Sequence, residues 1–450
     1  PEGTLVYNRR PVNGGPLHDP TAILYINNDL LDAVKSGERP AEPLVLRANA
    51  GDCIDLTLYN ELPDDMPDLA GFNTLPMIVD QFNNNHIRVS NEVGLHAQLL
   101  AYDVTRSDGT NVGTNPIQTV GPGNKASYQW YAGTHHLVAD SLETRPMEFG
   151  VVNLTPADPL KQASKGAIGA LVVEPLYTTW DPLAGASADI RQGCPPGSDC
   201  PDVIRTAFRE HVLFFQTDVN LRWGSEAKLE GDPGETHVYY AGEALPRTHH
   251  VEDAEDSGNK AFNYRTEPLW FRMGFSPETS LETTRGFVFT KSLLNSLVGG
   301  DPETPVFTAS AGEPVRFRVV APGGHARNSV FNLHGHVWEE LPYQNASSVL
   351  GHNPFSEVKG TMIGHGPSNH FDVLVPRAGG LFGIEGDYLF RDQTSHHFSG
   401  GMWGIFRVGP NGSFDCIQAP CYDTGPAIVP AATKQDSCVV DAQTGAVTCP

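Results

Sequence analysis

The chain has 450 residues, and its 30 basic and 53 acidic side chains give a formal net charge of -23. This balance argues against nucleic acid and anionic membrane surfaces as partners and suits a soluble chain. No stretch approaches the roughly 20 consecutive apolar residues that a membrane span needs. The length suits two or three domains, and 46 Gly and 36 Pro favour a β-rich fold with many turns.

In chain order, the first predicted element is a short amphipathic helix over residues 27–37. Beyond it, short alternating runs of apolar and β-branched residues, separated by Gly, Pro, Asn and Asp, predict strands. They lie at 43–62, 126–133, 166–175, 314–322, 370–380 and 401–410. The sequence therefore predicts an all-β fold of sandwich type with long loops.

A coarse internal repeat sets the predicted domain organisation. The run Ala48–Asp52 before one apolar strand is echoed by Ala309–Glu313 before another, and the strand GAIGALVVEP is echoed by GGMWGIFRVGP. Each half is therefore expected to be one β-sandwich. The predicted divisions are a first domain at 1–185, a linker with a disulfide loop at 186–205, a second domain at 206–410 and a disulfide-pinned tail at 411–450.

Six of the seven cysteines fall in three close pairs, and we expect these pairs to be disulfides. Neither CxxC spacing nor interleaved histidine favours zinc, which is the alternative. The predicted bridges are Cys194–Cys200, Cys416–Cys421 and Cys438–Cys449, the last across a hairpin with a Thr-Gly turn. Cys53 is left over and is expected to be a buried core thiol. Disulfides imply an oxidising compartment, so the predicted location is extracytoplasmic: periplasm, cell surface or secreted.

Four segments together resemble the multicopper oxidases, proteins built from cupredoxin domains. They are residues 43–62, 121–133, 331–342 and 388–408, and the resemblance covers most of 40–410. Residues 94–113, 148–159 and 260–272 are similar to the large, manganese-oxidising bacterial members. The resemblance implies two tandem cupredoxin-like Greek-key domains with copper as cofactor. It also implies oxidation of a metal ion or an organic reductant, with dioxygen as the electron acceptor.

The family's copper ligands map poorly onto the second half. The motif H-P-x-H-x-H-G falls on 329–335, where Ser329 and Asn332 replace histidines and only His334 matches, followed by His336. The motif H-C-H-x-x-x-H-x-x-x-x-M falls on 391–402, where His397 and Met402 take the blue-copper histidine and axial positions.

The cysteine position of this second motif is Asp392, and the histidines beside it are Arg391 and Gln393. The blue copper site depends on a thiolate whose bond to copper tunes the redox potential, and a carboxylate does not supply that bond. In the first half the family expects H-W-H-G and a later H-x-H. The chain has GLHAQ, with the single candidate His96, and EFGVVNL. The copper sites are therefore predicted to be incomplete.

Several histidines leave alternatives open. His334 and His336, two apart on a predicted strand, should share one face and suit one metal ion, or else hydrogen-bond a loop. A mononuclear site of these two with His397 is a further alternative. The remaining predictions are a cleft lined by His352, His365 and His370, an ion-paired network of Asp387, Arg391 and Asp392, and solvated pairs at 135–136 and 249–250.

Two functional hypotheses follow. The first is a multicopper oxidase, or a segment or subunit of one, in which other cupredoxin domains or subunits, including further copies of the chain, complete the copper sites. The second is a copper-free cupredoxin module used for scaffolding or assembly, without catalysis of its own. The sequence shows no signal peptide, so we expect a mature chain or a fragment of a longer one.

Overall fold

The computed structural model describes most of the chain. The described residues are 4–66, 89–139, 141–159, 161–193, 207–217, 219–249, 257–281, 288–323, 328–344, 349–410, 439–440 and 447–448. Strands dominate this part of the chain, and its helices are short. The predicted all-β architecture is confirmed. The predicted helix at 27–37 is present as η1 (Asn28–Leu30) followed by α1 (Leu31–Lys35).

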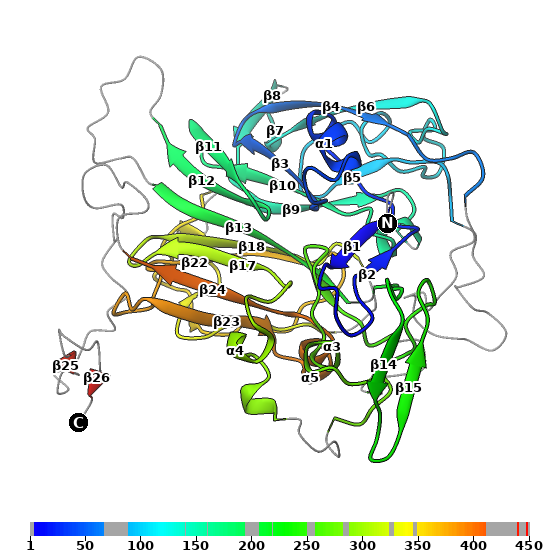
Figure 1. Ribbon diagram of the computed structural model, residues 1–450. Coiled ribbons are helices and arrows are strands. Elements are labelled where there is room, and N and C mark those ends of the chain that lie inside the picture. Colours follow the sequence, from blue (N-terminus) through cyan, green and yellow to red (C-terminus); the bar gives the residue numbers. More distant parts are fainter. Residues whose placement is uncertain are drawn as a thin grey trace.

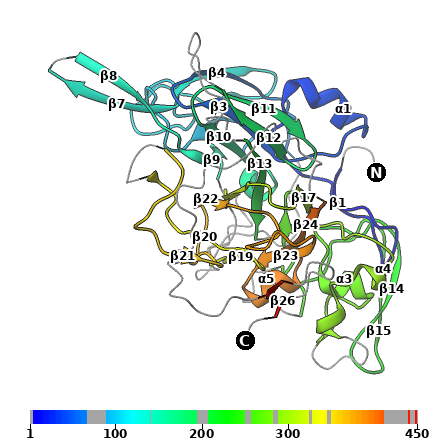
Figure 2. The ribbon, with the colours of Figure 1, turned by 90° about the vertical axis from the view of Figure 1, so that its left-hand side faces the viewer.

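Four layers of sheet are stacked on one another (Figure 1). In order, they are the pair β4–β6, the sheet β3-β10-β9-β5, the sheet β11-β12-β13-β18-β22 and the sheet β17-β24-β23-β19. Figure 2 shows the same order from the side. The first two layers form one sandwich and the last two form the other.

The strands of the first sandwich are β3 (Leu44–Asn49), β4 (Cys53–Tyr59), β5 (Leu95–Ala97), β6 (Lys125–Tyr131), β9 (Gly150–Pro156) and β10 (Gly169–Glu174). Four of these six strands, β3, β4, β6 and β10, coincide with predicted segments, whereas β5 and β9 were not predicted. In β4 every second residue is exposed, so Cys53 lies on the outer face. The prediction of a buried Cys53 thiol is wrong, because the two-residue period of the strand turns it outward while Ile54 faces the core.

The second sandwich repeats the strand arrangement of the first. Its outer sheet contains β17 (Val306–Ser310), β19 (Phe331–Leu333), β23 (Gly386–Asp392) and β24 (Trp403–Gly409). β17 runs parallel to β24, as β3 runs parallel to β10. In both sheets the two remaining pairs are antiparallel. The internal repeat in the sequence therefore corresponds to a repeated sheet topology.

The turn that ends the first strand of each sheet is also repeated. Asp52 Oδ2 accepts the backbone N–H of Asn49 at 2.8 Å, and Glu313 Oε2 accepts that of Ser310 at 2.6 Å. Gly51 and Gly312 have φ of +87° and +83° at the same place in the two turns. A positive φ favours glycine, which explains why A-G-D and A-G-E recur in the sequence.

The inner sheet of the second sandwich extends into the predicted linker. It contains β11 (Thr178–Leu183), β12 (Ser187–Gln192), β13 (Ala207–Gln216), β18 (Val315–Val320) and β22 (His370–Val375). β12, predicted to be linker, pairs antiparallel with both β11 and β13. The domain boundaries themselves remain a prediction.

Adjacent residues of the central strands face different hydrophobic cores. Val173 packs inside the first sandwich, whereas Val172 packs at the junction between the two sandwiches. Leu213 packs inside the second sandwich, whereas Phe214 lies at the junction. The central strands β10 and β13 are therefore buried on both faces, which explains the apolar runs that they contain in the sequence.

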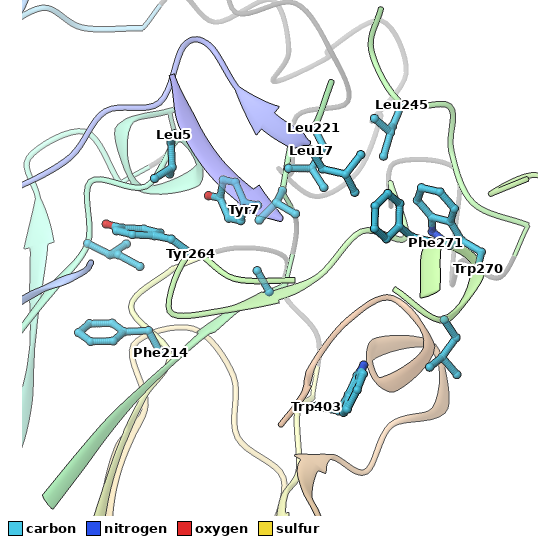
Figure 3. Close-up of a cluster of buried hydrophobic side chains, with 14 of the residues drawn as sticks. Leu5, Tyr7, Leu17, Phe214, Leu221, Leu245, Tyr264, Trp270, Phe271 and Trp403 are labelled. Atoms are coloured by element: carbon cyan, nitrogen blue, oxygen red, sulfur yellow. The ribbon is translucent and has the colours of Figure 1, made fainter. Parts of the chain in front are cut away.

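A ribbon near the N-terminus closes one end of this junction. β1 (Leu5–Asn8) pairs with β2 (Leu17–Asp19) and brings Tyr7 and Leu17 to the same apolar cluster as Phe214 and Tyr264 (Figure 3). The cluster continues to Trp403 at the start of β24. The ribbon thus ties the beginning of the chain to both halves.

The other elements are short strands and short helices outside the four layers. They are β7 (Gly133–Val138), β8 (Ser141–Pro146), α2 (Lys161–Ser164), β14 (Ala227–Glu230), β15 (Thr236–Tyr239), β16 (Ala261–Phe262), α3 (Leu269–Met273), η4 (Phe289–Lys291), α4 (Asn295–Val298), β20 (Trp338–Glu339), β21 (Val358–Lys359), α5 (Ser395–Ser399), β25 (Val439–Val440) and β26 (Val447–Thr448). Figure 2 shows the β7–β8 ribbon projecting from the first sandwich. No helix among the described residues is long and apolar enough to cross a membrane.

The three predicted disulfides lie outside the described residues. The hairpin predicted around the Thr-Gly turn is present, because Val440 of β25 pairs antiparallel with Val447 of β26. The bridges themselves stay predictions.

Candidate metal centre

Asp392 and His397 meet at the position that the resemblance assigns to blue copper. Asp392 ends β23 and His397 lies in α5, and both side chains are fully buried. The imidazole Nδ1 of His397 lies 2.7 Å from Asp392 Oδ2 and donates a hydrogen bond to it. Asp392 Oδ1 accepts the backbone N–H of Val330 at 2.9 Å and that of Thr394 at 3.0 Å. The carboxylate is therefore satisfied by protein donors on both oxygens.

These contacts set the acidity of Asp392. Burial alone would raise the pKa of a carboxyl group. Here the hydrogen bond and charge of His397, with the two backbone N–H groups, outweigh burial and lower the pKa of Asp392. The group is thus a buried anion held by donors around it.

Ser329, at the position of the family's first copper histidine, lies against the same imidazole. Its Oγ is 3.4 Å from His397 Nδ1, the nitrogen that Asp392 already binds. A nucleophilic Ser-His-Asp arrangement requires serine and aspartate on opposite ring nitrogens. The three residues therefore do not form a hydrolase triad, although they carry the right side chains.

Met402 takes part in the same local structure mainly through its backbone. Its N–H donates to the carbonyl of His397 at 3.0 Å, and its carbonyl accepts the N–H of Asp392 at 3.1 Å. The side chain is fully buried in the core of the second sandwich. The structure thus brings together Ser329, Asp392, His397 and Met402, the positions that the resemblance assigns to blue copper.

His334 and His336 do not share one face, so that prediction is wrong. β19 ends at Leu333, and Gly335, with φ of +72°, turns the chain between them. His336 is buried: its Nδ1 lies 2.9 Å from the carbonyl of His334, and its Nε2 accepts the N–H groups of Gly379 and Gly380 at 3.0 and 3.2 Å. Both ring nitrogens of His336 are therefore committed to the backbone, which is the loop-binding alternative.

His334 is exposed, and its surroundings disfavour a cation. Partial burial and the charge of Arg391 lower its pKa. Arg391 stands where the family has a copper histidine, and its guanidinium lies 4.8 Å from the ring centre of Phe398. A positive charge at that position repels a metal ion at His334.

His96, the single candidate of the first half, lies in β5. Its Nδ1 is 3.0 Å from the carbonyl oxygen of Asp108, and its ring packs edge-on against Tyr102 at 6.2 Å. These contacts tie His96 to the neighbouring loop. Its Nδ1 also lies 3.3 Å from Asp108 Oδ1, but among the described residues the two belong to no group of three potential metal ligands.

The other predicted polar groupings differ in outcome: the histidines described at 135, 136 and 249 are exposed as predicted, and the cleft of His352, His365 and His370 stays a prediction. Asp387 pairs with Arg407 at 2.7 Å and not with Arg391, so the predicted network of Asp387, Arg391 and Asp392 is wrong. His352 binds Glu339 at 2.5 Å, and His365 packs between Phe215 and Phe371. His135 and His136 are exposed, but on strand β7 and not in a loop. His249 is exposed, and His250 lies outside the described residues.

A blue copper centre does not fit the residues present. Asp392 offers no thiolate, and both of its oxygens are already hydrogen-bonded. Within the described ranges, no three His, Cys, Asp or Glu side chains are grouped so that they could hold a metal ion. The three histidines of the mononuclear alternative do not converge either, because His336 is committed to the backbone and His334 points to solvent.

Solved structures of copper proteins are similar to this one. The chain is 16% identical to the copper nitrite reductase from Nitrosomonas europaea, with a TM-score of 0.39, covering 82% of this chain and 84% of that one. It is 14% identical to a multicopper oxidase (TM-score 0.40; 82% and 78%) and 14% identical to the blue copper oxidase from Nitrosomonas europaea (TM-score 0.39; 81% and 76%). No family model and no curated protein sequence matches.

The sequence analysis missed a second polar site, at the junction of the two sandwiches. Five charged side chains from five strands, all nearly or fully buried, contact one another there. They are Arg47, Glu174, Glu210, Arg318 and Asp372. The signal was present in the sequence, because each interrupts an apolar strand, as Arg318 does in PVRFRVV.

Proposed function

We propose that this chain is a copper-free cupredoxin-type module that serves as a scaffold or in assembly, without oxidase activity of its own. The pair of Asp392 and His397 carries the proposal. At the position that the resemblance assigns to blue copper it supplies a buried carboxylate, and both oxygens of this carboxylate accept hydrogen bonds from protein groups. Without a thiolate there, electrons from a reductant have no entry point of the family's kind.

The surroundings support the same proposal. His336 uses both ring nitrogens to join two loops, and Arg391 adds positive charge where copper would need a neutral ligand. The copper-dependent oxidation implied by the resemblance would need ligands from another chain or segment.

The location and partners of the module are part of the proposal. The spacing of the six paired cysteines supports an extracytoplasmic compartment, where disulfides persist. The partners of a scaffold module would be other cupredoxin domains or further copies of the chain. A homo-oligomer is one form that such an assembly could take.

The test is copper reconstitution of the full chain followed by dialysis, elemental analysis and a visible spectrum. The wild-type protein should retain less than one equivalent of copper and show no intense blue band. Cys53 is exposed and offers a thiol to copper, so every variant is made in a Cys53→Ala background. Stoichiometric copper with a blue band in the Cys53→Ala protein would overturn the proposal.

A matched variant tests whether the position itself was identified correctly. The double change Ser329→His and Asp392→Cys restores the thiolate and the first histidine beside His397 and Met402. This variant should gain a thiolate-to-copper absorption band that the wild type lacks. A folded double variant that binds no copper would show that these residues do not occupy the copper position.

A further inference from the structure

The junction between the two sandwiches contains charges as well as apolar side chains. Along four of the five strands, β22 excepted, the charged residue lies two positions from a residue of the junction core, so both face the same way. Glu174 follows Val172, and Arg318 precedes Val320. The charges are therefore built into the packed face between the two middle sheets, in the middle of the stack in Figure 1.

Arg318 is the centre of this group. Its Nε donates to Glu210 at 2.7 Å, its Nη1 to Asp372 at 2.7 Å and its Nη2 to Glu174 at 3.0 Å. Arg47 adds a second bond to Glu210 at 2.8 Å. Strands of the first sandwich supply Arg47 and Glu174, and strands of the second supply the other three, so the network joins the two halves.

The formal charges of the network do not balance. Two guanidinium groups face three carboxyl groups, and the neighbouring Arg316 and Glu148 neutralise each other at 2.9 Å. A net negative charge in a fully buried place is very unfavourable unless one carboxyl group is protonated.

Glu174 is the group whose contacts call for a proton. Its Oε1 receives no N–H or hydroxyl donor, and the Nε of Arg47 is 4.0 Å away, too far for a hydrogen bond. Its other oxygen and Glu210 Oε2 both bind the guanidinium of Arg318, which brings the two carboxyl groups side by side. Glu210 accepts from Arg47 and Arg318 on its two oxygens, as an anion does.

We propose that Glu174 is a neutral carboxylic acid that donates its proton to the Glu210 carboxylate, and that this shared proton makes the junction of the two sandwiches sensitive to pH. The inference is independent of the copper position. The buried pair would hold the halves together while the proton is present, and ionisation of Glu174 would leave an unbalanced charge between them.

The acidities of the two groups agree with this assignment. Burial, and then the nearby Glu210, raise the pKa of Glu174 well above its ordinary value of 4.5. Burial acts in the same direction on Glu210, but Arg318 and Arg47 outweigh it and lower the pKa of Glu210 to about 2. The pKa of Glu174 is higher in the folded state than in the unfolded state. The stabilisation from its proton is therefore complete below the unfolded-state pKa and is lost as pH rises through the folded-state pKa.

The test is thermal unfolding of the wild type and Glu174→Gln from pH 5 upward. Glutamine mimics the neutral acid, so the variant should match the wild-type melting temperature near pH 5 within a degree or two. At higher pH its melting temperature should fall less than that of the wild type and end above it. The difference between the two proteins isolates Glu174, because every other titrating group is common to both.

Glu267→Gln is the matched control. Glu267 is also fully buried and pairs with Arg272, whose guanidinium is fully buried as well. Its substitution should lower the melting temperature by several degrees at every pH, because a buried arginine loses its counter-charge. If Glu174→Gln behaves like this control, or does not fold while the control does, Glu174 is an anion and the proposal is overturned.

A second readout needs no stability measurement. The infrared difference between the wild type and Glu174→Gln at neutral pH should contain the carbonyl stretch of a protonated carboxylic acid. A difference containing only carboxylate bands would contradict the shared proton.

Discussion

Gly150 lies against Asp372 so closely that a Cβ built on the glycine would fall 1.9 Å from Asp372 Oδ2. Gly150 begins β9 in the first sandwich, and Asp372 lies in β22 of the second. The contact lets the backbone N–H of Val151 reach both oxygens of Asp372 at 3.3 and 3.4 Å. The missing side chain of Gly150 therefore allows the two halves to approach.

Gly150→Ala should destabilise the protein by about 3 kcal/mol or more, because two effects add. Gly150 has φ of +68°, which strains alanine, and the new methyl group would clash with Asp372. Denaturant unfolding measures the loss. Gly185→Ala is the control, with φ of +74° and open space around a Cβ, and it should cost only about 1–2 kcal/mol. Equal losses in the two variants would mean that the contact with Asp372 is unimportant.

The regular parts of the fold could be predicted because they follow local rules. The alternation in 43–62 predicts β3 and β4, and the repeated A-G-D and A-G-E turns mark the same place in both halves. The error on Cys53 came from neglecting that same alternation. The error on His334 and His336 came from extending β19 past Gly335, where the backbone turns.

The sites were harder to predict, because they depend on which strands pack together. The copper resemblance placed Asp392 and His397 at one position, and the structure brings them to 2.7 Å. Nothing in the sequence pairs Glu174 with Glu210, since their contact arises only when the two sandwiches stack. A charged residue inside an apolar strand indicates a buried partner without identifying it.

Asp392→Asn should lower the free energy of unfolding by about 2–4 kcal/mol at neutral pH. The amide keeps an acceptor for Val330 and Thr394, but it loses the anionic bond from His397. Because the folded-state pKa of Asp392 is lowered, the stability that it contributes is present above its unfolded value and is lost as pH falls through its folded value. The difference in unfolding free energy between the wild type and Asp392→Asn should therefore become smaller in acid.

Asp387→Asn is the control for this variant. Asp387 pairs with Arg407 at the surface, where ion pairs contribute about 1 kcal/mol or less. Urea unfolding of the wild type and of both variants, at pH 7 and in acid, measures the two losses of stability. A loss for Asp392→Asn no greater than that for Asp387→Asn would contradict the structural role of the buried pair.

Arg318→Lys should cost about 3–5 kcal/mol although the charge is kept. Arg318 reaches three carboxyl groups with three nitrogens, and a lysine ammonium does not reproduce that planar fork. Arg407→Lys is the matched control, because Arg407 also bridges two carboxylates, Asp301 and Asp387, but at the surface. It should change stability by about 1 kcal/mol or less. Similar values for the two variants would argue against a tightly packed junction.

Glu313 should make stability fall between about pH 5 and pH 7. Burial raises its pKa from 4.5 to about 7, and the bond from Ser310 and the charge of Arg209 offset this only in part. The folded state thus prefers the protonated acid, and up to about 3 kcal/mol is lost as pH rises from the unfolded to the folded pKa. Glu313→Gln should flatten the dependence of unfolding free energy on pH in this window. Asp52→Asn changes the equivalent, exposed turn of the first half and serves as the control, which should keep the wild-type dependence on pH. An unchanged slope in Glu313→Gln would assign the titration to another group.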